Sequence, residues 1–235
     1  MSTHLSRKEL KQDNVALKVE ETTHFLVTHR PLVMRIAIIV LAVLVVGLGS
    51  WFFIGSRRDA REQALAAAVS MENAPVGAAP PNGGLSFPSD IAKTDAVHKA
   101  FTSIISQDAG SNEAYAAEYF LAGIDVSNAK SDDALKKYTE IASGADSDYA
   151  SLAKLAKAQL LFSLGNAAEA KTILDDLIAH PTATVSKEQA TFTLAKGIAS
   201  TQPDEARKLL VPIANLHTEI SQAAVTAMTE LPAAK

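Results

Sequence analysis

Paired acidic side chains recur at three places in the chain, and paired carboxylates can carry acid–base catalysis or bind divalent metal ions. The pairs are Asp132-Asp133, Asp175-Asp176 and Asp204-Glu205. The first and third pairs fall in the first turn of an expected helix, where the helix dipole favours negative charge. We therefore interpret them as helix-start residues and not as catalytic groups.

Histidines offer a second source of chemistry, at positions 4, 24, 29, 98, 180 and 217. None is spaced with a carboxylate on one helix face as a His-Glu-x-x-His zinc site requires. Asp146 and Asp148 lack the ligand order of an EF-hand and indicate a helix cap. The segment NGG at 82–84 lies among prolines, where no phosphate-binding loop is expected. The sequence thus predicts a protein that is not an enzyme and holds no cofactor or metal.

Composition points to close-packed helices. The chain has 235 residues, of which 48% are hydrophobic and only 6% aromatic. Much of the hydrophobic fraction is alanine, a strong helix former, whereas strands prefer β-branched and aromatic residues. The net charge of −4 gives no basic excess that would indicate nucleic acid binding. The absence of cysteine excludes disulfides and thiolate metal sites.

Residues 36–54, IAIIVLAVLVVGLGSWFFI, carry no charge. As a helix they would measure about 28 Å, close to the roughly 30 Å hydrocarbon core of a bilayer. Aromatic residues from Trp51 onward mark one end, and arginines bracket the run, as is typical of a membrane span. A signal peptide would have a shorter apolar run with a cleavage site, and a buried core helix would not be free of charge all round. We predict a retained transmembrane helix at 34–56.

The distribution of basic residues predicts the orientation of this span. Residues 1–35 carry six Lys and Arg, and the first turns after the span carry three. The excess favours a cytoplasmic N-terminus with the rest of the chain translocated. The predicted organisation is a cytoplasmic tail at 1–33, a stalk helix at 57–73, a Pro/Gly-rich linker at 74–90 and a helical domain at 91–235.

The helical domain contains a repeat with a step of 36 residues, in segments 113–142, 149–178 and 185–214. In the second half of each, alanine is followed by larger apolar residues four and seven positions later, which share one helix face. These residues are Ala134, Tyr138 and Ile141; Ala170, Leu174 and Leu177; and Ala206, Leu210 and Ile213. Each segment predicts a hairpin of two helices, A and B. Hairpins must stack to bury their apolar faces.

Further helices are expected at both ends of the stack. Residues 93–106 place Val97, Phe101 and Ile104 at the spacing of a helix B, and the stalk helix is its expected partner. Residues 218–231 predict a capping helix. The predicted fold class is therefore all-α, with a single N-terminal transmembrane helix followed by a helix-hairpin solenoid.

The central unit resembles a tetratricopeptide repeat. The resemblance rests on Ala170, Leu174 and Leu177 in helix B, Gly165 at the break and Pro181 after the unit. The chain departs from that motif in its period, which is 36 residues and not the usual 34. It also has Gly197 and Asp125 where a large helix-A residue is expected.

The whole layout resembles the bacterial ancillary SecYEG translocon subunit family, although the 74–90 loop has no counterpart in that pattern. Membership would imply a bacterial inner-membrane protein whose periplasmic repeats assist secreted proteins. Its partners would be translocon subunits, a membrane-anchored chaperone and unfolded secreted clients. The alternative is a repeat scaffold for another envelope complex, in cell division or outer-membrane biogenesis. The sequence does not distinguish between these two hypotheses, and it does not determine the oligomeric state.

The A helices supply the candidate binding site, because in stacked hairpins of this type they line the concave face. The repeat register assigns to this face Tyr119, Gly123, Leu155, Gln159, Phe162, Thr191 and Ala195. Such a groove would suit an extended peptide or a partner helix. The absence of a basic patch argues against selection of acidic tails. In the alternative interpretation, Leu155 and Phe162 are ordinary core residues.

Overall fold

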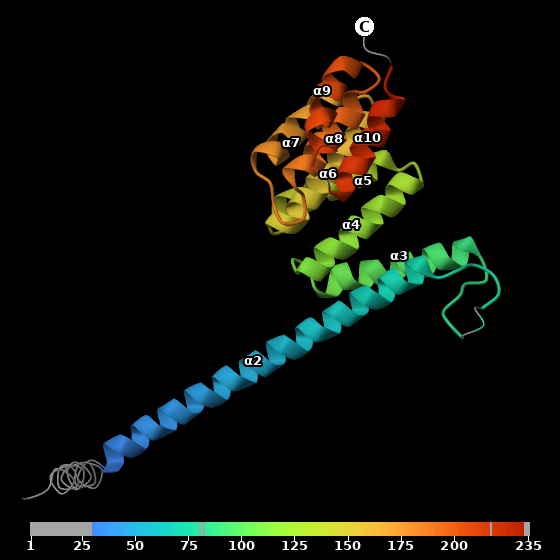
Figure 1. The fold of residues 1–235 in the computed structure, drawn as a ribbon. Helices are drawn as coiled ribbons and strands as arrows, with labels where there is room; N and C mark the ends of the chain where they lie inside the picture. Colours follow the sequence, from blue (N-terminus) through green and yellow to red (C-terminus); the bar gives the residue numbers. More distant parts are fainter. Residues whose placement is uncertain (1–29, 80, 82, 217, 233–235) are drawn as a thin grey trace, which may run out of the picture. The chain divides into compact units, whose positions relative to one another are not determined.

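The computed structural model describes residues 30–79, 81, 83–216 and 218–232 (Figure 1). Within this part of the chain, the regular secondary structure is helical. The helices are α2 (Arg30–Asn73), α3 (Asp90–Gln107), α4 (Asn112–Ser127), α5 (Ser131–Gly144), α6 (Ser147–Ser163), α7 (Ala167–Ala179), α8 (Lys187–Ile198), α9 (Pro203–Ala214) and α10 (Glu219–Glu230). The chain divides into two units, Met1–Asp59 and Ala60–Lys235.

The described part of the first unit is the N-terminal part of α2. Its large apolar side chains from Ile38 to Leu48 are between 51% and 67% exposed. Among the residues that the structure describes, no helix offers an apolar stretch long enough to cross a membrane. The span predicted at 34–56 lies partly outside that description, which omits the side chains of 36–37 and 49–56. Residues 1–29 of the predicted tail are also outside it.

The second unit is a stack of helix hairpins. Each helix from α3 to α10 contacts the next along the chain. In addition, α4 contacts α6, α6 contacts α8, and α8 contacts α10, so the first helices of successive hairpins lie side by side (Figure 1). This pattern of neighbours is typical of a solenoid, in which each repeat buries its apolar face against the next. The fold is therefore all-α and repeat-like.

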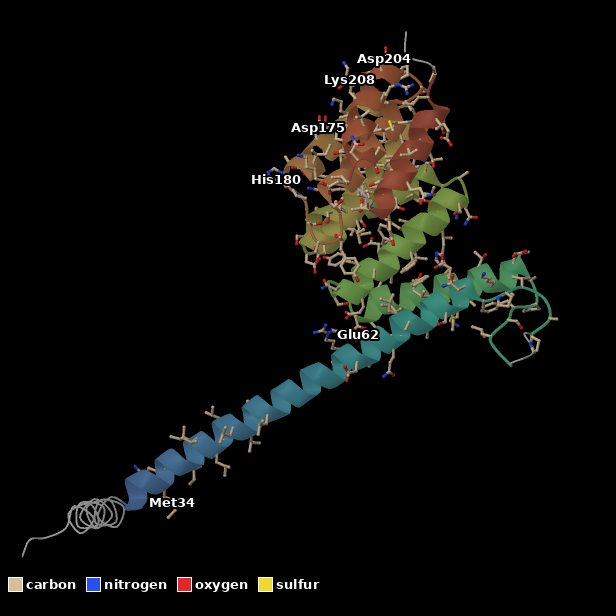
Figure 2. The ribbon with its side chains drawn as sticks, in the orientation of Figure 1. Met34, Glu62, Asp175, His180, Asp204 and Lys208 are labelled. Atoms are coloured by element: carbon tan, nitrogen blue, oxygen red, sulfur yellow. The ribbon has the colours of Figure 1, made fainter. Side chains whose placement is uncertain are left out.

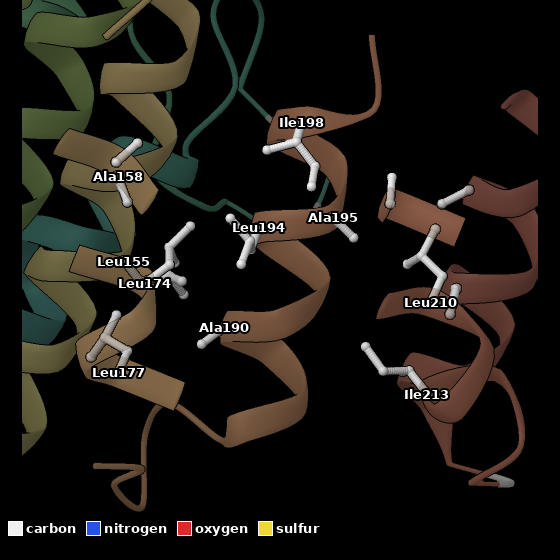
Figure 3. Packing of buried hydrophobic residues seen from close by; sticks show 14 of the residues in the cluster. Leu155, Ala158, Leu174, Leu177, Ala190, Leu194, Ala195, Ile198, Leu210 and Ile213 are labelled. Atoms are coloured by element: carbon white, nitrogen blue, oxygen red, sulfur yellow. The ribbon is translucent and has the colours of Figure 1, made fainter. Parts of the chain in front are cut away.

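The predicted helix-B register agrees with the burial of the side chains. Ala134, Ala170 and Ala206 are completely buried in α5, α7 and α9. The larger residues four and seven positions later in each helix are buried as well. Alanine at the first position lets helix B approach helix A, and the larger side chains fill the space between hairpins. Figure 3 shows Leu174 and Leu177 of α7 facing Leu194 of α8.

The first hairpin of this unit pairs residues 60–73 of α2 with α3. Val97, Phe101 and Ile104 of α3 are buried in one cluster with Ala68, while Leu65 packs against it. This pairing is the one that the sequence predicts for the stalk helix. The Phe101 ring stacks on Phe120 of α4, with 5.3 Å between centroids, which joins the hairpin to the repeats.

The Pro/Gly-rich segment after α2 forms a loop within this hairpin. The Gly77 N–H donates to the Phe87 carbonyl at 2.8 Å, and the Phe87 N–H donates to the Pro75 carbonyl at 3.0 Å. Lys93 Nζ also donates to the Ala74 carbonyl at 2.8 Å. Composition alone indicates a linker, but these bonds hold the two ends of the segment together and connect it to α3.

Both departures from the tetratricopeptide pattern have partners in the structure. The Asp125 carboxylate accepts a hydrogen bond from Lys137 Nζ at 2.7 Å, which links α4 to α5. Gly197 leaves room on α8 for the Phe162 ring of the preceding hairpin, since a Cβ at this position would overlap that ring. Leu161 occupies the equivalent position of the central unit and is buried. In the first unit the Asp125–Lys137 ion pair therefore stands where a large helix-A residue is expected. In the third unit the Phe162 ring of the preceding hairpin fills that space.

Candidate functional site

A groove opens along the second unit between α6, α8 and α10, with a volume of about 690 Å³. It is lined by Gln159 and Phe162 of α6; Ser186, Gln189, Phe192, Thr193, Lys196 and Gly197 in and before α8; and Glu219 and Ile220 of α10. A second hollow of about 540 Å³ shares Ser186, Glu219 and Ile220 with it and adds Glu188, Leu216 and Thr218. The two hollows therefore form one groove across the first helices of successive hairpins.

The groove combines apolar surface with amide and charged groups. Phe162, Phe192 and Ile220 supply the apolar surface, and Gln159 and Gln189 supply side-chain amides. Lys196 Nζ lies 5.9 Å from the centre of the Phe192 ring, within range of a cation–π interaction. Apolar pockets with a few amide groups suit an extended peptide, whose side chains fill the pockets while its backbone hydrogen-bonds to the amides.

The hydroxyl groups of the groove are engaged with the backbone of α8. The Ser186 side chain accepts the Gln189 N–H at 3.1 Å and so caps the start of α8. Thr193 donates to the Gln189 carbonyl at 3.0 Å. Neither hydroxyl is hydrogen-bonded to a basic side chain that could activate it as a nucleophile. These contacts shape the helix that carries the groove.

The loop between α7 and α8 holds the end of the groove through a cluster of hydroxyls. The Ser151 hydroxyl lies 2.7 Å from that of Thr182 and 3.1 Å from that of Thr184. Thr184 donates to the Asp148 carbonyl at 2.9 Å. Ser151 itself is buried in α6. The cluster joins the loop to the start of α6 and thereby fixes Ser186, the first groove residue of the third repeat.

The residues that the sequence assigns to the groove have different environments. Gln159 and Phe162 line it. Leu155 and Ala195 are core residues, 6% and 0% exposed, in the cluster that extends from α6 to α10. Helix A is apolar on two faces, and these two side chains face the neighbouring helices. For Leu155 the structure therefore agrees with the alternative of an ordinary core residue.

The other three assigned residues do not line the groove. Thr191 is half-buried, and its hydroxyl donates to the Lys187 carbonyl at 2.8 Å. Tyr119 of α4 packs against Tyr138, with ring centroids 5.6 Å apart, and Gly123 follows it on the same helix. The groove thus begins at α6 and includes α10, a helix to which the sequence assigns only a capping role.

Phe192, Lys196 and Ile220 are among the eight groove residues that sequence reasoning missed. Gln189, Phe192 and Lys196 follow one another at three- and four-residue spacing along α8, which would have placed them on one face. Which face is open depends on how α10 packs against α8, and the repeat register does not contain that information. The capping helix supplies one wall of the groove through Ile220.

The Gly197–Phe162 contact leads to a matched pair of substitutions. We expect Gly197→Ala to lower the free energy of unfolding by about 1–2 kcal/mol, because the added methyl overlaps the Phe162 ring and forces it to move. Gly123→Ala, in the equivalent type of helix, meets no atom within 4 Å and should raise stability by up to about 1 kcal/mol through helix propensity. Urea unfolding of both variants measures the difference. Equal effects of the two substitutions would contradict the packing.

The acidic pairs lie on the outside of the stack. Asp132-Asp133 and Asp204-Glu205 occupy the first turns of α5 and α9, as predicted. Asp176, near the end of α7, accepts hydrogen bonds from Lys154 Nζ at 2.8 Å and from His180 Nδ1 at 3.1 Å. The Lys154 bond lowers the pKa of Asp176 below its usual range. Figure 2 labels Asp175 and Asp204 at this surface.

The described residues contain no group of three or more His, Cys, Asp or Glu placed to hold a metal ion. Asp146 has the predicted capping role. Its side chain accepts the backbone N–H of Asp148 at 3.2 Å and that of Tyr149 at 3.1 Å. These bonds fix the start of α6, so this acidic pair is explained by helix capping.

Glu118 of α4 has an unusual environment. Burial and its hydrogen bond to the neighbouring carboxyl of Glu140 in α5 raise the pKa of Glu118 to about 7, and nearby Lys137 offsets this only in part. Burial disfavours the charged carboxylate, and a second carboxylate nearby disfavours it further. The α4–α5 hairpin therefore carries a group that titrates near neutral pH.

We expect this group to make stability depend on pH. Folding raises the pKa of Glu118 above its ordinary value near 4.5. The protonated side chain therefore stabilises the fold fully at a pH below 4.5, and this stabilisation is lost as the pH rises through 7. The free energy of unfolding of Glu118→Gln, relative to that of the unmodified protein, should therefore rise by about 1 kcal/mol between pH 4.5 and pH 8, after allowance for solvent screening. Glu140→Gln should give a shift of the same sign. Urea midpoints at the two pH values test this, and parallel pH profiles for all three proteins would contradict it.

Compared with known protein families, curated proteins and solved structures, the chain gives no match.

Proposed function

We propose that the protein binds segments of other proteins in the groove formed by α6, α8 and α10. The observation that carries this proposal is an apolar lining of Phe162, Phe192 and Ile220 beside the amides of Gln159 and Gln189. A hollow that combines apolar side chains with a few polar groups is typical of a binding site. The proposed role of the groove is binding, and its Ser186 and Thr193 hydroxyls are hydrogen-bonded to the backbone of α8.

The proposal includes an anchor in the bacterial inner membrane. The described side chains from Ile38 to Leu48 are apolar and exposed around α2, and a helix that is apolar all round needs an apolar environment. Together with the uncharged sequence 36–54, this favours a single-pass protein. The basic residues of 1–35 favour a cytoplasmic N-terminus and a periplasmic repeat domain.

The partner class follows from the layout of a membrane anchor with tetratricopeptide-like hairpins. This layout resembles the ancillary translocon subunit family, so we propose that the groove serves the Sec translocon and the periplasmic chaperoning of secreted proteins. Its partners would then be translocon subunits, a membrane-anchored chaperone or unfolded secreted clients. A scaffold for cell division or outer-membrane biogenesis would use the same groove, and the partners decide between these roles.

Purification of the full-length protein from membranes in mild detergent tests this proposal. Co-purifying proteins are quantified by mass spectrometry for the unmodified chain and for Phe192→Ala, which removes half of the aromatic surface. Translocon subunits or a membrane-anchored prolyl isomerase, enriched in the unmodified sample and depleted about tenfold by Phe192→Ala, would support the secretion role. Enrichment of another envelope complex would move the function to the scaffold. If the co-purifying proteins were recovered in equal amounts with Phe192→Ala, a function that depends on the groove would be contradicted.

A further inference from the structure

We propose that the groove selects peptide segments by charge at both ends, taking an apolar core flanked by a cationic residue on one side and an anionic residue on the other. The inference rests on the proposed function, since it specifies what the groove binds. It follows from the charges at the two ends of the groove, which have opposite signs, and from its apolar middle.

One end of the groove is cationic. Lys196 belongs to the last turn of α8, and it lines the groove beside Phe162. It forms no ion pair with any described residue, and its ammonium group lies over the Phe192 ring. An ammonium held near an aromatic ring at the groove wall is available to an anionic side chain of a bound peptide.

The other end is acidic. Glu219 opens α10 and lines the groove, and Glu188 in the first turn of α8 lines its continuation. Neither carboxylate forms an ion pair with a described residue. The helix dipole explains acidic residues in first turns, but it does not explain why both carboxylates border the same hollow. A cationic residue of the peptide would face two acidic groups there.

The distance between the two ends sets the length of the segment. From Ser186 to Lys196 the groove follows α8 for ten residues, or about 15 Å at 1.5 Å per residue. An extended chain covers this distance in roughly five residues at 3.3 Å each. The middle residues would meet Phe162, Phe192 and Ile220, and the amides of Gln159 and Gln189 would bind the peptide backbone. The preferred segment is thus a cation, about three apolar residues and an anion.

Three peptides test the charge requirement on the full-length protein in lipid nanodiscs. Their cores are Arg-Leu-Phe-Leu-Asp, Arg-Leu-Phe-Leu-Arg and Asp-Leu-Phe-Leu-Asp, each flanked by Gly-Ser and labelled with fluorescein. Fluorescence anisotropy gives the affinities. The bipolar peptide should bind three- to fivefold more tightly than either like-charged peptide at low salt. The advantage should disappear at high salt, because these charges are exposed to solvent.

Charge reversal at either end provides the matched controls. With Lys196→Glu the doubly cationic peptide should become the tightest of the three. With Glu219→Lys, which leaves Glu188 in place, the bipolar peptide should lose its advantage over the doubly anionic one. Both positions are exposed, so the variants should keep the helical content of the unmodified protein. Charge selection would be overturned if the unmodified protein bound the three peptides with equal affinity, or if neither charge reversal changed the order of affinities. Either result would leave the proposed function intact. No binding of any peptide, or binding unchanged in Phe192→Ala, would overturn the proposed function as well.

Discussion

Replacing Leu174 by alanine is expected to lower the free energy of unfolding by about 3–4 kcal/mol. Leu174 is completely buried between hairpins, in the cluster that joins the second repeat to the third. Its truncation removes buried methyl groups and leaves a cavity that neighbouring helices fill only in part. Because each hairpin is stabilised by its neighbours, the loss should extend across the stack. Chemical unfolding followed by circular dichroism measures the effect.

Leu164→Ala is the control for this prediction. The same side chain is truncated one residue after α6, but Leu164 is 43% exposed. Its loss should cost less than about 1 kcal/mol, since part of the side chain already meets water. Similar costs for the two substitutions would contradict the hairpin stack, because in that case Leu174 would not fill an interface between repeats.

Deletion of residues 34–56 is expected to move the protein completely from the membrane fraction to the soluble fraction. The segment contains the uncharged run 36–54, and the tail and helical repeats offer no comparable apolar stretch. The shortened protein should keep the helical content of the repeats, because their core lies within Ala60–Lys235. Cell fractionation and circular dichroism measure the two properties.

Restoration of an apolar segment controls for other effects of the deletion. Replacing residues 34–56 by an unrelated run of leucine and alanine of equal length should return the protein to the membrane fraction, since hydrophobic length is the property that matters. Recovery of the unmodified full-length protein in the soluble fraction, or its release from membranes by alkaline carbonate, would contradict the anchor.

The hairpin stack could be predicted because its signal is local. Apolar residues follow the alanines at 134, 170 and 206 four and seven positions later. This spacing places each set on one helix face, whichever elements pack against that helix. The same spacing identified Val97, Phe101 and Ile104 in α3. All of these side chains are buried. The buried face of each helix can therefore be predicted from one sequence when its apolar residues recur at a regular spacing.

The groove could be predicted only in part, because it depends on the angles between hairpins. Leu155 and Phe162 share the apolar surface of α6, yet one is a core residue and the other lines the groove. Their difference arises from α8, where Gly197 admits the Phe162 ring, and from α10, which closes the far side through Ile220. Such contacts between distant residues leave no periodic signal in the sequence.

Photo-cross-linking in living cells tests the central claim that the groove holds other polypeptides. A photoreactive phenylalanine derivative replaces Gln159, an exposed groove residue, and in a second protein it replaces Lys171, an exposed residue of α7. The account predicts polypeptide adducts at position 159 that are lost when Phe192→Ala is added, and none at position 171. Equal adducts at both positions, or adducts at 159 that persist with Phe192→Ala, would contradict it.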